Sequence, residues 1–98
     1  MDLHQIERKQ RRGKILRALN QIYPRDLLIK TLVRILEEAK LCSSTEKVES
    51  DLAYLADKEY LETSKITDEG EDVTLARLTA HGKDLIEGNI CADVGVEF

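Results

Sequence analysis

Helically spaced apolar residues first appear in residues 1–22. The apolar face of this stretch is made of Ile15, Leu16, Leu19 and Ile22. Recurrence at intervals of three and four residues is typical of an amphipathic α-helix, and we expect one helix that begins near Leu3. Gly13 lies inside the pattern and costs about 1 kcal/mol of helix stability relative to alanine. It therefore marks either a break in the helix or a place where another helix approaches closely.

A second helix is expected at about residues 25–40. Pro24 separates it from the first helix, because the residue before a proline avoids the α conformation. Proline is also well suited to the first turn of a helix, where no backbone donor is needed. Apolar residues cover more than half of the circumference of this second stretch, which is typical of a central, buried helix.

A third helix is expected at residues 43–58. Val48, Leu52 and Leu55 lie at positions i, i+4 and i+7 and form one apolar stripe. The hydroxyl side chains that can cap its start belong to Ser43, Ser44 and Thr45. Acidic residues follow in the first turn, where the helix dipole favours negative charge.

A β-hairpin and a short helix are expected after the third helix. The two strands are expected at residues 60–66 and 73–78, joined by an acidic tip at residues 67–72. Gly70 in this tip can adopt the positive φ that hairpin turns require. Thr79 can cap a last helix at residues 80–87, and Gly88 is a typical stop signal.

The length of 98 residues is sufficient for one domain with one modest core. We expect that domain to cover residues 1–88. Residues 89–98 show no periodicity, and we expect this tail either to be loosely ordered or to dock against a partner.

Charge is distributed unevenly along the chain. The net charge is −4, but residues 1–34 hold nine Lys and Arg against three acids, whereas residues 35–98 hold six against sixteen. Such asymmetry hints at a charged partner, although charged helix faces are most often simply solvated.

No residue pattern points to catalysis, a metal site or a cofactor, and we expect none of these. The two histidines, His4 and His81, are far apart, as are the two cysteines, Cys42 and Cys91, and Cys42 stands alone in its turn. A small secreted domain held by disulfides usually carries more cysteines, so we expect a cytoplasmic protein. No apolar run is long enough to span a membrane, and the N-terminus lacks the apolar core of a signal peptide.

Two segments carry a family resemblance. LAYLADKEYLETSKI and ARLTAHGKDLIEG resemble the recognition helix, wing and LTxxGxxLI pattern of winged-helix regulators of the MarR, PadR and ArsR types. The resemblance covers roughly residues 15–88 and is more specific for the fold than for one family; a weaker one is to small proteins of Mu-like phages. It implies a mainly α fold with a small β-hairpin: a three-helix core, a two-stranded wing and a short C-terminal helix. The sequence departs from the pattern at Glu59, where a glycine is usual, and at the wing tip, which lacks a basic residue.

The resemblance implies a DNA-binding transcriptional regulator that inserts the third helix into the major groove. The candidate contacts on this helix are Ser43, Ser44, Thr45, Lys47, Ser50 and Tyr54. The first helix offers cations for the phosphate backbone, namely Arg8, Lys9, Arg11, Arg12 and Lys14. Regulators of this fold usually read two half-sites, so we expect a homodimer formed by the first helix, the last helix or both.

An alternative partner is another protein. The third helix carries four carboxylates against two lysines, and the wing tip carries four carboxylates and no base. Carboxylates are repelled by phosphates, so this acidic helix-and-wing face is suited to a basic protein partner, and fold alone does not decide between the two.

Overall fold

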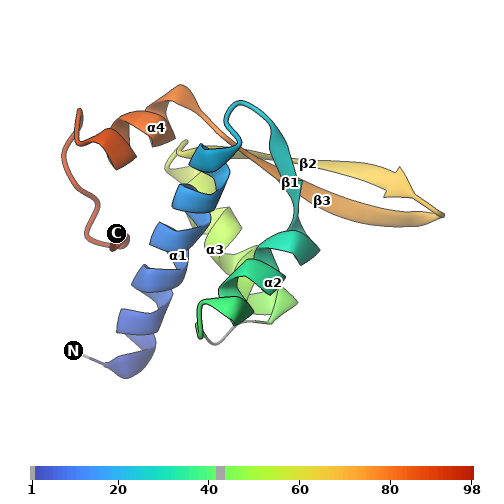
Figure 1. Cartoon of the computed structure of the whole chain (residues 1–98), viewed down its shortest axis with the longest axis horizontal. Coiled ribbons are helices and arrows are strands. Elements are labelled where there is room, and N and C mark those ends of the chain that lie inside the picture. Colours follow the sequence, from blue (N-terminus) through green and yellow to red (C-terminus); the bar gives the residue numbers. More distant parts are fainter. Residues whose placement is uncertain (1, 42–43) are drawn as a thin grey trace.

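The computed structural model describes residues 2–41 and 44–98 of the chain. Its elements follow in the order α1 (Leu3–Gln21), β1 (Asp26–Leu28), α2 (Ile29–Glu38), α3 (Thr45–Asp57), β2 (Leu61–Asp68), β3 (Glu71–Leu78) and α4 (Ala80–Glu87). Helices α1, α2 and α3 pack around one core, and β2 and β3 project from it as a long hairpin (Figure 1). The molecule measures 41 × 29 × 22 Å along its principal axes.

The expected first helix is confirmed by α1, which is continuous through Gly13. Asp2 caps its start, because the Asp2 side chain accepts a hydrogen bond of 3.0 Å from the backbone N–H of His4. Gly13 is a place of close approach, as one alternative held, but the segment that approaches is the C-terminal tail. A Cβ at residue 13 would collide with the backbone oxygen of Glu97.

The prediction of a helix from residue 25 was wrong at its start. Residues 26–28 form β1, and α2 begins at Ile29. Pro24 follows a cis peptide bond and lies in the turn before β1, not in the first turn of a helix. A short apolar run such as residues 27–29 cannot be assigned to strand or helix from periodicity alone. Here β1 pairs with β3, with Leu27 opposite Ala76.

The expected third helix is confirmed by α3. The Ser44 hydroxyl caps it by accepting a hydrogen bond of 3.2 Å from the backbone N–H of Lys47, whereas Ser43 lies outside the described residues. The helix ends in a Schellman motif: the N–H of Tyr60 donates to the carbonyl of Leu55, and that of Glu59 to Ala56. Glu59 has the left-handed φ of 64°, which explains why a glycine is usual at this position.

The sheet has the strand order β1-β3-β2, one strand more than the expected two-stranded wing. The hairpin is also tighter than expected: the strands extend into the predicted tip and leave a two-residue turn. Glu69 and Gly70 in that turn have φ of 53° and 82°, the combination found in type I′ hairpins. Leu61 and Leu78 face each other across the strands and are both buried.

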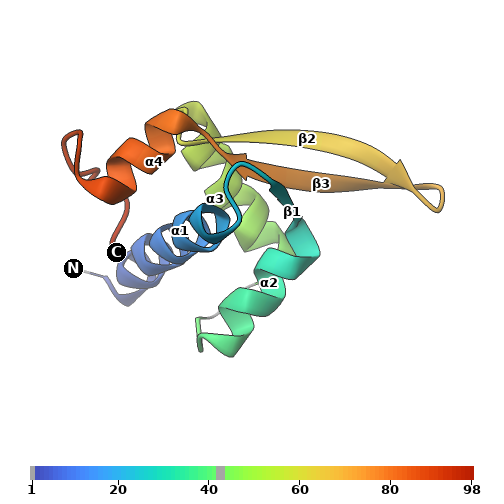
Figure 2. The ribbon, with the colours of Figure 1, turned by 45° about the horizontal axis from the view of Figure 1, so that its top comes forward.

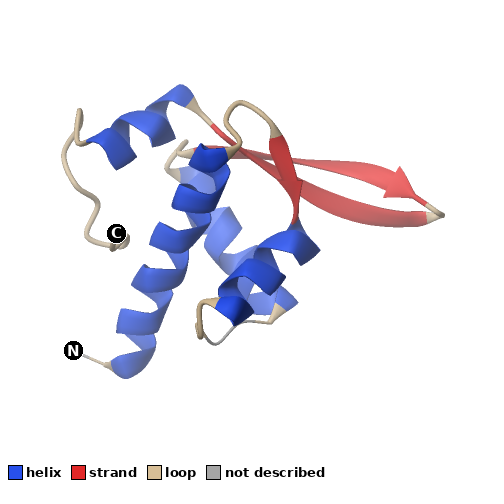
Figure 3. Cartoon of the chain, in the orientation of Figure 1, coloured by secondary structure: helices blue, strands red, loops and turns tan. Residues whose placement is uncertain are grey.

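The last helix, α4, is confirmed at the expected residues. The Thr79 hydroxyl caps it by accepting a hydrogen bond of 3.0 Å from the N–H of Gly82. Gly88 stops it in the left-handed conformation. The core between the helices and the base of the sheet is almost entirely aliphatic. Three helices, a β-hairpin and a following helix in this order (Figures 2 and 3) form a winged helix-turn-helix, so the expected fold class is confirmed.

Candidate nucleic-acid interface

A groove of about 310 Å³ separates the N-terminal halves of α1 and α3. It is lined by His4, Glu7, Arg8, Arg11, Lys47, Ser50 and Asp51. The spacing of three and four residues within each set places the set on one face of its helix. Arg8 and Lys47 are exposed on opposite walls. The groove therefore brings together candidate residues from the two helices that the sequence proposed.

Asp51 at the base of this groove is buried and paired with two arginines. Its side chain is 1% exposed. The Nε atom of Arg11 lies 2.6 Å from one carboxylate oxygen, and the Nε atom of Arg12 lies 3.1 Å from the other. Both arginines are themselves buried. Their guanidinium groups therefore join α1 to α3, a contact that the sequence did not predict.

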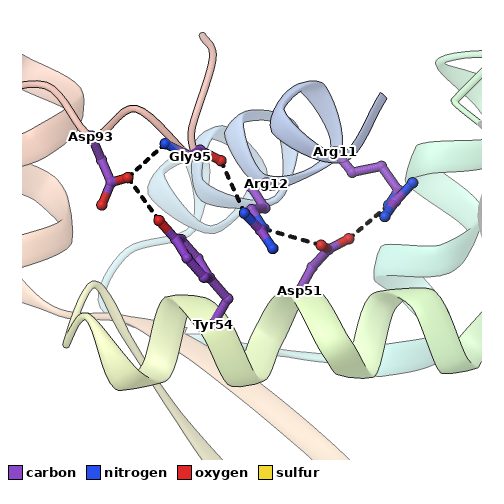
Figure 4. A network of polar contacts seen from close by, with 6 residues as sticks. All are labelled: Arg11, Arg12, Asp51, Tyr54, Asp93 and Gly95. Carbon is purple, nitrogen blue, oxygen red and sulfur yellow. Dashed lines mark hydrogen bonds and ion pairs between the residues drawn. The ribbon is translucent and has the colours of Figure 1, made fainter. Parts of the chain in front are cut away.

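Tyr54, the next turn of α3 beyond Asp51, joins the same network (Figure 4). The guanidinium carbon of Arg12 lies 3.7 Å from the centroid of the Tyr54 ring, a cation–π contact. The Tyr54 hydroxyl donates a hydrogen bond of 2.8 Å to Asp93 in the C-terminal tail. The Tyr54 hydroxyl is thus engaged within the chain instead of facing outward.

The tail carboxylate of Asp93 also accepts hydrogen bonds from the Tyr60 hydroxyl, at 2.8 Å, and from the backbone N–H of Gly95, at 2.7 Å. Burial works to raise the pKa of Asp93, but these hydrogen bonds outweigh it and lower that pKa. Burial, the hydrogen bond to Asp93 and its negative charge raise the pKa of Tyr60 to about 12. The same causes raise the pKa of Tyr54.

The remaining candidates lie nearer the surface. Thr45 and Ser50 are exposed on α3, and Lys9 and Lys14 are half-buried on α1. The candidate residues therefore divide in two. Arg8, Lys47 and Ser50 line the α1–α3 groove, whereas Lys14 lines a different cleft, beside Gly13 and the C-terminal tail. The second group, formed by Arg11, Arg12 and Tyr54, joins the interior network, and Arg11 also lines the groove.

The opposite side of α3 faces the wing across a second cleft of about 220 Å³. This cleft is lined by Glu49, Leu52, Ala53, Thr63, Lys65 and Thr74. Of its two charged groups, Glu49 is negative and comes from α3, and Lys65 is positive and comes from β2. The two sides of α3 thus differ, and the cations cluster on the side of α1.

The sequence did not predict that Asp93 and Gly95 connect the C-terminal tail to α1 and α3 by hydrogen bonds. Asp93 is 39 residues from Tyr54 and 33 from Tyr60, so no local periodicity connects them. The one available signal was the Asp-Val-Gly sequence within the tail, because aspartate often accepts a hydrogen bond from the backbone two residues on.

The comparisons with known proteins bear on the fold. A crystal structure described as a PadR family transcriptional regulator from Eggerthella lenta DSM 2243 is similar to this chain with a TM-score of 0.63. The two share 16% sequence identity over 81% of this chain and 70% of that one. At this identity the similarity shows a common winged-helix fold. No protein-family model matches the sequence, and no curated protein matches it. The weaker resemblance to phage proteins stays a prediction.

Two kinds of feature are absent from the described residues. None of the helices there has the length and apolar character needed to cross a membrane. Residues 2–41 and 44–98 also contain no group of three or more His, Cys, Asp or Glu side chains placed to hold a metal ion.

Proposed function

We propose that this chain is a small winged-helix regulator that binds duplex DNA through the N-terminal half of α3 and the adjacent face of α1. The observation that supports this best is the groove between these helices, whose walls carry Arg8 on one side and Lys47 on the other. Cations beside the phosphate backbone provide most of the nonspecific affinity for DNA, because they release condensed counterions. Ser44, Thr45 and Ser50 add hydroxyl groups that can contact phosphate.

The interior network narrows the set of DNA contacts that we propose. Arg11, Arg12 and Tyr54 support α3, whereas the contacts to DNA come from the residues nearer the surface: Ser44, Thr45, Lys47, Ser50, Arg8, Lys9 and Lys14. In this arrangement the salt bridges of Asp51 set the spacing of the two groove walls.

The test of this proposal is the double variant Arg8→Ala plus Lys47→Ala, titrated against a random-sequence duplex by fluorescence anisotropy. Loss of two phosphate contacts should weaken binding and reduce the slope of log affinity against log salt by about 2. The matched control is Arg77→Ala plus Lys83→Ala, which removes two charges on β3 and α4. If the control weakens binding as much as the groove variant, the effect is one of net charge, and the proposed interface is wrong.

A second candidate function is docking to a basic protein. Acidic residues exposed on α3 and the wing favour it, and so does the wing itself, where Ile66 is 46% exposed opposite Val73. Glu49→Lys plus Asp57→Lys discriminates between the two functions, because both residues are exposed on α3. The reversal should tighten DNA binding if α3 faces phosphates, and abolish capture of a basic partner if α3 faces protein.

We further propose that the chain acts as a homodimer. Leu3, at the start of α1, is 65% exposed, and an exposed leucine next to a half-buried Ile6 offers an apolar contact for a second copy. Light scattering at high micromolar concentration should give twice the mass of one chain, which is 11.2 kDa. A mass of one chain would contradict the dimer but not the binding of DNA.

A further inference from the structure

The C-terminal tail, residues 90–98, packs closely against α1 and α3 because a glycine lies on each side of the contact. Gly13 on α1 leaves room for the backbone of Glu97, and Gly95 in the tail leaves room for the Tyr54 hydroxyl. At either position a Cβ would overlap its neighbour. The backbone N–H of Glu97 also donates a hydrogen bond of 3.1 Å to the carbonyl of Lys9. The tail therefore fits a specific seat on this surface.

The tail touches both helices that form the proposed DNA interface. On the α3 side, Asp93 accepts hydrogen bonds from Tyr54 and from Tyr60, which follows the helix. On the α1 side, the carbonyl of Gly95 accepts a hydrogen bond of 3.3 Å from the guanidinium group of Arg12. A segment bonded to both helices resists their separation.

The network continues from the tail to the groove itself. Arg12 connects the tail to Asp51 (Figure 4). Asp51 lines the groove together with Ser50 and Lys47. Tyr54 lies one turn after Ser50 on α3, on the side where Arg12 stacks on its ring. A displacement of Tyr54 would therefore also move the turn that carries the proposed DNA contacts.

We propose that residues 90–98 form a strap that fixes α3 against α1, and that Asp93 is a positioning residue for DNA binding. This inference rests on the proposed function, because it assigns to the tail the task of holding that same interface in place. Asp93 touches no DNA in this account; it acts through Tyr54, Tyr60 and the N–H of Gly95.

The sign of the effect separates positioning from electrostatics. Asp93→Asn removes one negative charge, which by Coulomb attraction alone would tighten binding to DNA. The strap predicts the opposite, a loss of affinity of about fivefold or more. Gly95→Ala provides an independent variant, since it leaves the charge unchanged and places a methyl group against the Tyr54 hydroxyl. It should weaken binding in the same direction.

Val94→Ala is the matched control. Val94 lies between Asp93 and Gly95 and is 88% exposed, so its truncation should leave both the tail contacts and the affinity unchanged. Hydrogen exchange of the Glu97 amide reports whether the tail is docked, because that N–H is bonded to α1. Denaturant titration of each variant identifies the conditions under which it remains folded.

The expected result is faster exchange at Glu97 and weaker DNA binding in Asp93→Asn and Gly95→Ala, with neither change in Val94→Ala. The proposal is overturned if the tail is released and DNA binding is equal or tighter, or if the Glu97 amide stays protected in both variants. If the unmodified protein binds no DNA, the proposed function fails, and amide exchange along α3 tests the strap separately. Unchanged α3 exchange after release of the tail would then contradict the strap.

Discussion

Asp51 joins α3 to α1 through two ion pairs. Its carboxylate is almost fully buried and has a guanidinium group at each oxygen. Removal of one member of a buried ion pair lowers the free energy of unfolding by much more than the intact pair adds to it, because the remaining charge is buried without a partner. Here the remaining charges would be two cations that face each other.

We therefore predict that Asp51→Asn lowers the free energy of unfolding by about 3–5 kcal/mol. Small domains have a total stability of about 5–15 kcal/mol, so the variant would be partly unfolded under mild denaturant. Urea titration followed by circular dichroism measures the change. Asp57→Asn, on the exposed face of the same helix, should change stability by less than about 0.5 kcal/mol. Equal effects of the two substitutions would show that the buried pair has no special role.

Glu59 adopts a backbone conformation that suits glycine. A non-glycine residue in the left-handed region costs about 1–2 kcal/mol, and Glu59 does so at the end of α3. We predict that Glu59→Gly stabilises the protein by about 1 kcal/mol and raises Tm by about 4–8 °C. Thermal unfolding measures this. Glu49→Gly makes the same chemical change inside an exposed turn of α3 and should destabilise by about 1 kcal/mol. Destabilisation by Glu59→Gly would contradict the conformational argument.

At the residue scale, the sequence predicted the local hydrogen bonds that cap helices but not the ion pairs between residues far apart in the chain. It placed the capping hydroxyl of α3 among Ser43, Ser44 and Thr45 and that of α4 at Thr79, because caps act over three residues; Ser44 and Thr79 are the caps. It did not predict that Arg11 and Arg12 pair with Asp51, about 40 residues away. Their contact with a phosphate backbone stays a prediction. Contacts over such distances depend on how the helices pack, and a local pattern does not contain that information.

At the scale of elements, strong local signals were sufficient for the helices and the hairpin. Cap and apolar stripe agree in α3, cap and stop signal agree in α4, and both helices lie where they were expected. The sequence did not predict β1, since a three-residue strand exists only through its pairing with β3, about 50 residues later. The tail likewise has no periodicity of its own, and its structure comes from its seat on α1 and α3.

The strap should also respond to pH. Tyr60 has a folded-state pKa of about 12 against an ordinary value of 10.0, so its contribution to stability is present below pH 10 and is lost as the pH rises toward 12. For Asp93 the folded-state pKa is lowered. Its contribution is present above its ordinary pKa of 3.8 and is lost as the pH falls through the folded-state value.

We predict that Asp93→Asn shifts the ionisation of Tyr60 part of the way back toward pH 10. The negative charge disappears, and an amide offers one acceptor oxygen to the three donors that Asp93 serves, while burial remains. Spectrophotometric titration of tyrosinate measures the shift. Asp84→Asn removes an equal charge from α4 and should leave the curve unchanged. An identical titration in the Asp93 variant would show that Asp93 does not hold Tyr60.

At the scale of the whole molecule, the acidic wing tip and the cations of the α1–α3 groove lie in different parts of the structure. The wing tip, where Glu69, Glu71 and Asp72 are exposed, projects from one end, and the start of α1 and the end of the C-terminal tail lie at the other end (Figures 1 and 2). A duplex attracted to the groove between α1 and α3 would therefore approach the body of the protein, where the exposed cations lie, and would keep the acidic tip away from its backbone. This arrangement differs from one in which the wing tip supplies the phosphate contacts.

The most direct test of this account is a fluorescence-anisotropy titration of the unmodified protein with a random-sequence duplex, at low salt and again at physiological salt. With Arg8, Lys47 and their neighbours at the backbone, we predict binding at micromolar concentration or tighter at low salt. The slope of log affinity against log salt should be about −2 to −4, as expected for two to four neutralised phosphates. Absence of binding at low salt would contradict the proposed function and would favour the acidic face as the site of a basic protein partner.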